Sequence, residues 1–203
     1  MYFDNFSISK LSFEDCALFL GGRLDRMPEN IIFMMEKAMQ QVLKASKPKA
    51  IFKVFDINSI DENGDTNIIN LNGTTYKPVG HSICNHLKDS SKAVLLCATI
   101  GPDVDRLIKK VQLQDMAYAL VVDAMAGVMI ETVCDNIEKE LINIYKPRNM
   151  TFRFGLGYGD LPIEQEPEFL NLLNAQKEIG VCSSSSYLLT PCKSVACIIG
   201  LQY

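Results

Sequence analysis

The sequence predicts an α+β fold, in which helices pack against an antiparallel sheet. Helical and strand-like patterns interleave along the 203 residues. Turn sequences of the hairpin type stand between neighbouring strand-like runs, and hairpins join antiparallel strands. One long helical pattern spans residues 115–145, apolar in its first half and charged in its second. Together these observations favour α+β over a doubly wound parallel sheet.

The size and composition fit a single domain spanning residues 1–203. With 48% apolar and 22% charged residues, a chain of this length can bury a core without metal or disulfide staples. Its formal net charge is −4, and its basic residues are scattered. A nucleic-acid surface needs clustered lysines and arginines, so we expect no nucleic-acid partner.

Several features predict a cytoplasmic protein without a membrane partner. The first ten residues mix polar side chains among a few apolar ones, unlike a secretory signal. The most apolar stretch, Tyr118 to Ile130, is too short to span a bilayer and carries Asp123. The seven cysteines are odd in number and include no Cys-x-x-Cys pair, which favours a reducing compartment.

Two helices are predicted before the first long strand, over residues 11–21 and 28–46. Pro28 suits the first turn of the second helix, because a proline there loses no helical hydrogen bond. Apolar residues then recur at helical spacing and form an amphipathic stripe, which consists of Ile31, Ile32, Met35, Met39, Val42 and Leu43.

A β-rich segment follows these helices. Ile51–Ile57 and Asn67–Leu71 are strand-like, and the run Asp61-Glu62-Asn63-Gly64-Asp65 between them has the composition of a turn. Asn72-Gly73, between Leu71 and Thr74, is a second and stronger hairpin signal.

The remainder of the chain alternates helices and strands. Before the long helix we expect a short helix at His81–Asp89, a strand at Ala93–Ile100, and a turn at Gly101-Pro102-Asp103 that begins another helix. After it we expect a strand at Met150–Phe154, a helix at Glu164–Glu178 closed by Gly180, and strands at about 181–189 and 194–201.

The chain lacks common metal-binding and catalytic patterns. His81 and His86 are its only histidines, and a five-residue spacing does not place both on one helix face. The acidic run 61–65 is similar to a calcium loop, but Thr66 stands where that loop needs glycine and Asn72 where it needs glutamate. We therefore predict no metal site and no histidine-based acid–base catalysis.

A glycine-rich segment follows the strand predicted to end at Phe154. Gly155, Gly157 and Gly159 preclude regular structure, and a dinucleotide fingerprint would need its third glycine one residue later. Glycines still let backbone groups approach a ligand closely. The planar guanidinium of Arg153 can bind a carboxylate through two parallel hydrogen bonds. The combination suits an amino-acid or nucleoside ligand. The alternative, slightly favoured by the residues alone, is a surface loop with one solvated arginine.

Two acidic residues, Asp123 and Glu131, stand in the apolar half of the long helix. A carboxylate on a buried face is costly unless it is paired or used, which makes such residues site candidates. For Asp123 we favour a position on the solvent side of the helix.

The segment that begins at Arg153 resembles a family motif. Arg153-Phe-Gly-Leu-Gly157-Tyr158 is similar to the Arg-x-x-x-Gly-Tyr segment with which the activation domain of cobalamin-dependent methionine synthase binds S-adenosylmethionine. The segment from Ser186 to Val195 resembles the family's closing segment, and Ala98–Asp105 resembles short, free-standing members. The resemblance marks residues 80–203 as an S-adenosylmethionine-binding core and leaves residues 1–80 less diagnostic.

The resemblance implies a twisted antiparallel sheet with a long central helix and flanking helices. It also implies roles for individual residues, none of which acts as an acid or base. Arg153 would engage the methionyl carboxylate, the backbone around Gly155 and Gly157 would hold the adenine side, and Tyr158 would wall the pocket. Glu131 would complement the amino group or the sulfonium. The resemblance also implies that Tyr187, in the closing segment, is a ligand-binding residue.

In that family the activation domain presents the methyl group of S-adenosylmethionine to cobalamin that has decayed to cob(II)alamin, with an electron usually supplied by a flavodoxin. This chain has no Asp-x-His-x-x-Gly cobalamin motif. The corrin would therefore come from a partner, either a cobalamin-binding protein or a methionine synthase lacking its own activation domain. The resemblance thus implies a component of a methyltransferase system that acts in trans.

Three other functions remain open. The chain could serve another corrinoid methyltransferase, or it could be a non-catalytic S-adenosylmethionine sensor. The third is a dinucleotide-dependent oxidoreductase. It would be distinguished if NAD protected the protein from unfolding and S-adenosylmethionine did not.

Overall fold

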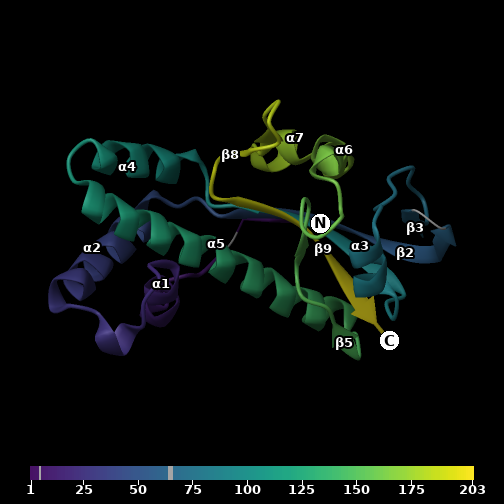
Figure 1. The fold of residues 1–203 in the computed structure, drawn as a ribbon, viewed down its shortest axis with the longest axis horizontal. Coiled ribbons are helices and arrows are strands. Elements are labelled where there is room, and N and C mark those ends of the chain that lie inside the picture. The colour runs from purple at the N-terminus through teal and green to yellow at the C-terminus, as the bar shows by residue number, and fades with distance from the viewer. Residues whose placement is uncertain (5, 64–65) are drawn as a thin grey trace.

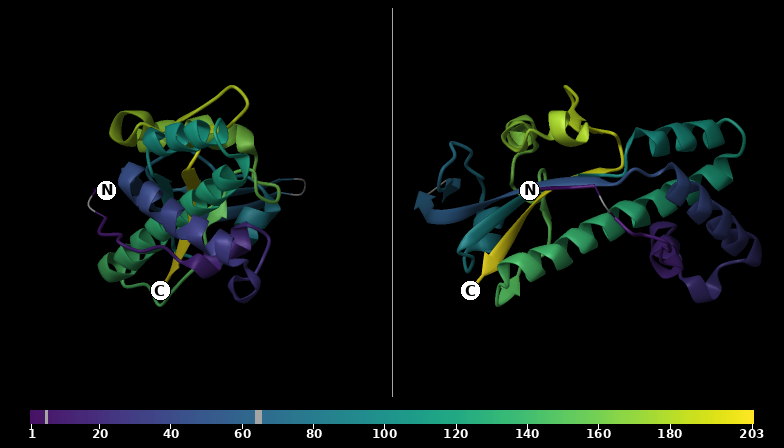
Figure 2. Two further views of the ribbon diagram at one scale, coloured as in Figure 1. Left: turned by 90° about the vertical axis from the view of Figure 1, so that its left-hand side faces the viewer. Right: turned by 180° about the vertical axis from the view of Figure 1, so that it is seen from behind.

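The computed structural model describes residues 1–4, 6–63 and 66–203. Within these residues a seven-stranded sheet lies at the centre, and helices cover both of its faces (Figures 1 and 2). The main strand order is β1-β2-β4-β9-β5, with β3 added to β2 and β6 added to β9. Every pairing is antiparallel. The α+β class predicted from the sequence is confirmed.

The strands of this sheet and of a separate short hairpin are β1 (Tyr2–Phe3), β2 (Lys49–Asn63), β3 (Thr66–Leu71), β4 (Lys92–Thr99), β5 (Asn149–Met150), β6 (Phe154–Gly155), β7 (Cys182–Ser183), β8 (Leu189–Thr190) and β9 (Ser194–Gln202). The α-helices are α1 (Phe13–Phe19), α2 (Glu29–Ala45), α3 (His81–Leu87), α4 (Pro102–Gln112), α5 (Met116–Tyr145), α6 (Glu166–Leu173) and α7 (Ala175–Ile179). Two 3-10 helices, η1 (Leu24–Arg26) and η2 (Ile163–Gln165), precede α2 and α6.

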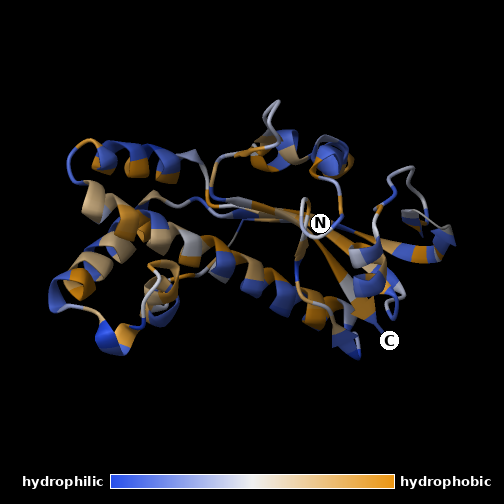
Figure 3. Ribbon diagram, in the orientation of Figure 1, coloured by the Kyte–Doolittle hydropathy of each residue, from blue (hydrophilic) through white to orange (hydrophobic). Residues whose placement is uncertain are grey.

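The two central strands, β4 and β9, separate two hydrophobic cores. Successive side chains of a strand point to opposite faces. Leu96 therefore packs with α5 and α2 in one core, whereas Leu95 packs with α3 and α6 in the other. Because both faces are covered, these strands consist of nearly continuous apolar residues, which are orange in Figure 3.

The long predicted helix is confirmed as α5, which crosses one face of the sheet diagonally (Figure 1). It begins at the N-cap Asp115, whose carboxylate accepts from the Tyr118 N–H at 3.0 Å, and it ends at Lys146 in the left-handed conformation. By length and composition α5 is apolar enough to cross a membrane, but 67% of its apolar window is buried inside the fold. Its apolar character is thus explained by core packing.

Several predicted elements differ from the structure. The hairpin expected at Asn72-Gly73 is wrong, because β3 pairs with β2, and the chain after Gly73 makes only an isolated bridge from Val79 to Ile68. Pro78 precedes that bridge and has no N–H to donate to a ladder. The acidic turn is also displaced: β2 continues through Asn63, and residues 64–65 lie outside the described residues.

Three elements are broken where the sequence predicts continuity. The strand at 150–154 is split into β5 and β6, and the helix at 164–178 is split into α6 and α7 by Asn174 in the left-handed conformation. The strand expected at 181–189 is a small hairpin, β7–β8, which closes over residues 184–188. In each case local backbone geometry overrides a pattern that only reports hydrophobicity.

Candidate functional site

Arg153 lies on the edge of the sheet, in the short segment between β5 and β6. Both strands pair with β9, through Met150 opposite Leu201 and Phe154 opposite Ile198. Between them Thr151 uses its side chain to accept from the Gly200 N–H at 2.8 Å. The ladder is interrupted at this point, so the backbone around Arg153 is not part of a regular strand.

Three carboxylates from α5 hold the guanidinium of Arg153. Its Nη2 donates to Glu131 at 2.7 Å, and its Nη1 donates to Asp135 at 2.9 Å and to Glu138 at 2.6 Å. Positions 131, 135 and 138 share one helix face, because they are four and three residues apart. The structure thus brings together Glu131 and Arg153, two of the six residues implied by the resemblance.

The guanidinium keeps two donors for a ligand. It has five N–H groups, and the three bonds to α5 use both on Nη1 and one on Nη2. The remaining Nη2 hydrogen and the Nε hydrogen have no partner among the residues described. The Nε–Nη2 edge of a guanidinium matches the geometry of a carboxylate.

The electrostatics of this cluster depend on partial burial. Burial by itself lowers the pKa of Arg153, but the hydrogen bond to Asp135 and the neighbouring carboxylates raise that pKa overall, so the side chain stays charged. Burial raises the pKa of Glu138, and the positive charge of Arg153 opposes the shift. Three carboxylates against one guanidinium leave the cluster with an excess of negative charge.

A groove of about 520 Å³ opens beside Arg153, between α1 and α5. One wall belongs to α5 and the other to α1, whose Phe19 ring lies next to Gly127 of α5. The groove combines apolar walls with charged groups, as ligand sites do, and its lining consists of Asp15, Leu18, Phe19, Val128, Glu131, Thr132, Asp135 and Arg153. Asp123 is the other acidic residue in the apolar half of α5. It faces solvent, as expected from the sequence, and pairs with Lys193 at 3.0 Å.

The first glycine of the glycine-rich segment, Gly155, belongs to β6 and pairs with Cys197, contrary to the expectation of irregular structure, and the chain then forms a tight turn. The Tyr158 N–H donates to Gly155 O at 3.2 Å, and the Gly157 N–H donates to Leu161 O at 3.0 Å. Gly157 has a φ of +80°, a conformation that other residues rarely adopt. Three of the implied residues, Gly155, Gly157 and Tyr158, are therefore fixed in one turn.

Aromatic side chains line the opposite side of the same edge. Phe154 points away from Arg153 into the second core, and Tyr158 packs edge-on against it with ring centroids 5.4 Å apart. The His86 ring lies 4.4 Å from that of Phe152, and its Nε2 contacts the Phe152 carbonyl at 3.0 Å. Phe152 and Tyr158 are mostly exposed. Arg153 and Tyr158 thus face opposite sides of one edge, and a ligand reaching both lies across it.

Tyr187 is not brought to Arg153 by any contact of the described residues. It lies in the turn between β7 and β8, where its N–H donates to Ser184 O at 3.1 Å. Leu189 of this hairpin packs on the second core, whereas α5 belongs to the first. The hairpin accordingly lies across the sheet from α5 (Figure 1), and a ligand role for Tyr187 stays a prediction.

Asp160 ties the glycine-rich turn to α3. Gly80, the N-cap of that helix, has no side chain to cap it. Asp160 accepts instead from the backbone N–H groups of His81 at 2.6 Å and Ser82 at 2.8 Å. A carboxylate at this position satisfies donors that would otherwise lack helical partners. The turn that carries Tyr158 is therefore anchored.

This anchor should make stability depend on pH. The N–H groups of Ser82 and His81 lower the pKa of Asp160. The ionised form therefore stabilises the fold above the ordinary pKa of about 3.9, and this stability is lost as the pH falls through the lower folded value. In chemical denaturation, the stability difference between the wild type and Asp160→Asn should be constant near neutrality and shrink below about pH 4. A difference unchanged by pH would contradict the anchor.

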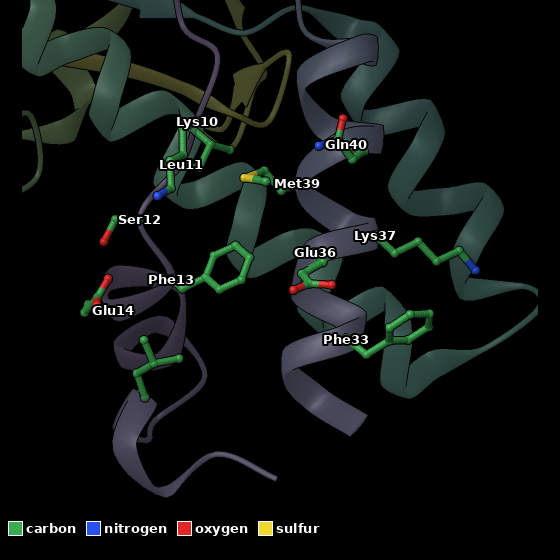
Figure 4. Close-up of a pocket in the computed structure, with 11 residues that line it drawn as sticks. Lys10, Leu11, Ser12, Phe13, Glu14, Phe33, Glu36, Lys37, Met39 and Gln40 are labelled. Carbon is green, nitrogen blue, oxygen red and sulfur yellow. The ribbon is translucent and has the colours of Figure 1, made fainter. Parts of the chain in front are cut away.

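A larger cavity lies elsewhere, between the N-terminal segment and α2. It has a volume of about 750 Å³, and Figure 4 shows Phe13, Phe33 and Met39 among its apolar side chains, with Glu36 and Lys37 beside them. No residue of this cavity belongs to the Arg153 cluster. We place the candidate site at Arg153 because charged donors and acceptors converge there beside apolar walls, which volume alone does not provide.

Comparisons with known proteins identify the fold. No family model and no curated protein matches the chain. Among solved structures it is similar to the MetH reactivation domain bound to AdoHcy, with a TM-score of 0.66 and 17% identity over 93% of this chain and 74% of that chain. The chain therefore has the fold of that domain, a curled antiparallel sheet with a long central helix, as the resemblance implied.

Sequence reasoning missed three acidic residues of the site. Asp135 and Glu138 follow Glu131 at helical spacing, and this periodicity in the charged half of the helix could have revealed them. Asp15 carries no comparable signal, because only the packing of α1 on α5 brings it to the groove.

Proposed function

We propose that this chain binds S-adenosylmethionine at the sheet edge around Arg153. The proposal rests on one observation: Arg153 keeps two free donors while acidic side chains surround it, in the fold of a domain that holds AdoHcy. S-adenosylmethionine carries one carboxylate and two positive groups, an ammonium and a sulfonium. A donor pair set among carboxylates is complementary to both kinds of charge.

In this arrangement Arg153 binds the methionyl carboxylate, and Glu131 binds the ammonium or sulfonium. The turn at Gly155 and Gly157 places backbone groups near the adenine side, with Tyr158 stacking from the other side of the edge. These residues orient the ligand, and none of them needs to transfer a proton. These residues contribute to the rate of methyl transfer by positioning the methyl group.

The biological role we propose is a reactivation module that acts in trans. Its partner is a cobalamin-dependent methionine synthase without an activation domain, or a separate cobalamin-binding protein. The chain would support reductive methylation of cob(II)alamin in the cytoplasm, with a flavodoxin as the electron donor.

Two measurements test the proposal. Calorimetric titration with S-adenosylmethionine should show saturable binding, and NAD in a parallel titration should show none. The protein is then added to a methionine synthase lacking its activation domain, with cob(II)alamin and a reductant, and methylcobalamin is followed by its absorption spectrum. Binding with reactivation supports the full role. Binding of S-adenosylmethionine without reactivation of any corrinoid partner favours the S-adenosylmethionine sensor. Binding of NAD without binding of S-adenosylmethionine favours the oxidoreductase.

A further inference from the structure

Helix α2 buries one face and exposes the opposite one. Met35, Ala38 and Val42 are fully buried and pack in the first core, on the side of α5. In the left view of Figure 2, α2 lies in front of α5. The residues farthest from the buried face are all exposed and form the outer stripe of α2, which consists of Glu29, Phe33, Glu36, Lys37, Gln40 and Lys44.

The outer stripe contains three rows, each with residues seven positions apart. Seven residues make almost two full turns of an α-helix, so the members of a row lie above one another. Glu29 and Glu36 form an acidic row on one flank, and Lys37 and Lys44 form a basic row on the other. Figure 4 shows the Glu36 and Lys37 side chains leaving α2 in different directions. The central row consists of Phe33 and Gln40.

The charged side chains of the outer stripe are available to a partner. None of the ion pairs formed by the described residues uses Glu29, Glu36 or Lys44. Lys37 lies over the exposed side of the Tyr118 ring, with its Nζ 4.8 Å from the centroid. Glu36 and Lys37 do not neutralise one another, because consecutive residues of a helix do not face each other.

Phe33 stands between two hollows of the surface. One, of about 750 Å³, lies between α2 and the N-terminal segment, and the other, of about 570 Å³, lies between α2 and the turn that joins α4 to α5. Phe33 lines both of them and is 68% exposed. An exposed aromatic residue with charged residues around it is typical of a protein–protein contact.

We propose that the outer stripe is the contact surface between two copies of this chain, related by a twofold axis parallel to α2. Such an axis brings the acidic row of each copy to the basic row of the other, so that Glu36 faces the partner's Lys37 on both flanks. Phe33 then packs on the partner's Phe33. Gln40 meets the partner's Gln40, and the two amides exchange hydrogen bonds.

The charges of the outer stripe favour a second copy over a different partner. Two glutamates and two lysines give the stripe no net charge, and their separation onto opposite flanks makes it complementary to itself. A partner surface of one sign would repel one of the two rows. An antiparallel pair of α2 helices would bring rows of like charge together, so the same charges favour the parallel arrangement.

The proposed contact is small and independent of the candidate ligand site. Helix α2 has 17 residues and is about 25 Å long. A contact along one helix of this length falls below the roughly 1,200 Å² of stable complexes, so we expect a weak, reversible dimer. No residue of the outer stripe lines the groove beside Arg153. Each copy therefore keeps its groove open.

Sedimentation equilibrium tests the dimer, at protein concentrations from about 1 μM to about 1 mM, the range of weak association. The average mass should rise with concentration from 22.7 kDa toward twice that value. Glu36→Lys gathers only cationic side chains beside the axis, and Lys37→Glu only anionic ones. Each variant should therefore self-associate about tenfold more weakly than the wild type. An equimolar mixture of the two should associate as the wild type does, because both flanks of the mixed dimer again join opposite charges.

A pair of alanine variants separates the contact from general surface effects. Phe33→Ala should weaken self-association about tenfold, as expected for an aromatic residue at the centre of a contact. Leu188→Ala is the matched control, because Leu188 is also 68% exposed but lies in the β7–β8 hairpin on the other side of the sheet. It should leave the association unchanged.

Two outcomes would overturn the proposal. One is a wild type that keeps a mass of 22.7 kDa at every concentration, which would leave the outer stripe to a different protein. The other is a mixture of Glu36→Lys and Lys37→Glu that associates no better than either variant alone. Glu36→Lys should bind S-adenosylmethionine as the wild type does, so failure of the dimer and failure of the proposed function are measured separately.

Discussion

Replacing Arg153 by alanine should weaken the binding of S-adenosylmethionine by about 10–150-fold, the effect of losing charge-assisted hydrogen bonds worth about 1.5–3 kcal/mol. The two free donors of the guanidinium disappear, and no other described residue of the groove lining carries a positive charge. Calorimetric titration measures the loss directly. Arg153→Lys should recover only part of the affinity, because an ammonium cannot present the planar fork.

The same substitution should also weaken the fold near neutral pH. Without Arg153, Glu131, Asp135 and Glu138 repel one another along one face of α5, where like charges four residues apart are unfavourable. Protonation removes this repulsion, so the deficit in stability relative to the wild type should shrink as the pH falls. Denaturation at several pH values separates this effect from the loss of ligand contacts.

Arg23→Ala is the control for both measurements. Arg23 is a surface arginine that pairs with Asp25 at 3.1 Å, and exposed pairs of this kind contribute little. It should change neither affinity nor pH dependence. If Arg153→Ala bound S-adenosylmethionine as tightly as the wild type, the ligand site would have to be moved away from the sheet edge.

The sequence was sufficient to predict the elements whose patterns are long. The helix over residues 115–145 and the central strands are continuous in hydrophobicity, and the structure contains them as α5, β4 and β9. Short elements depend on backbone details that hydrophobicity does not report. Asn174 in the left-handed conformation splits one predicted helix, and the interruption at Thr151 splits one predicted strand.

The site was predictable at its local motif and, through the family resemblance, at Glu131. Arg153, Gly157 and Tyr158 form a local motif that could be recognised directly. The ion pairs to α5 and the α1 wall of the groove depend on contacts between segments far apart in the chain. Asp15, for example, is separated from Glu131 by more than half of the chain. A helical pattern predicts that α1 exists, but it does not predict which helix α1 covers.

Gly80→Ala should destabilise the protein by about 2–5 kcal/mol, which combines the cost of a disfavoured backbone conformation with that of overpacking. Gly80 has a φ of +134°, and a Cβ there would stand 2.8 Å from the backbone oxygen of Asp160. The oxygen cannot retreat freely, because Asp160 also bonds the N–H groups of His81 and Ser82. Each kcal/mol should lower the Tm of a chain of this size by about 2–4 °C.

Gly73→Ala separates the two parts of this cost. Gly73 also has a positive φ, +80°, but a Cβ there meets no atom within 4 Å. It should therefore cost only the backbone part, about 1–2 kcal/mol. The excess for Gly80→Ala combines the contact with Asp160 and the higher backbone cost of the extended, positive-φ conformation of Gly80. The displaced turn should also weaken S-adenosylmethionine binding through Tyr158. Equal Tm values for the two variants would mean that Asp160 moves without resistance, and the turn at Gly155–Tyr158 would then not be held by α3.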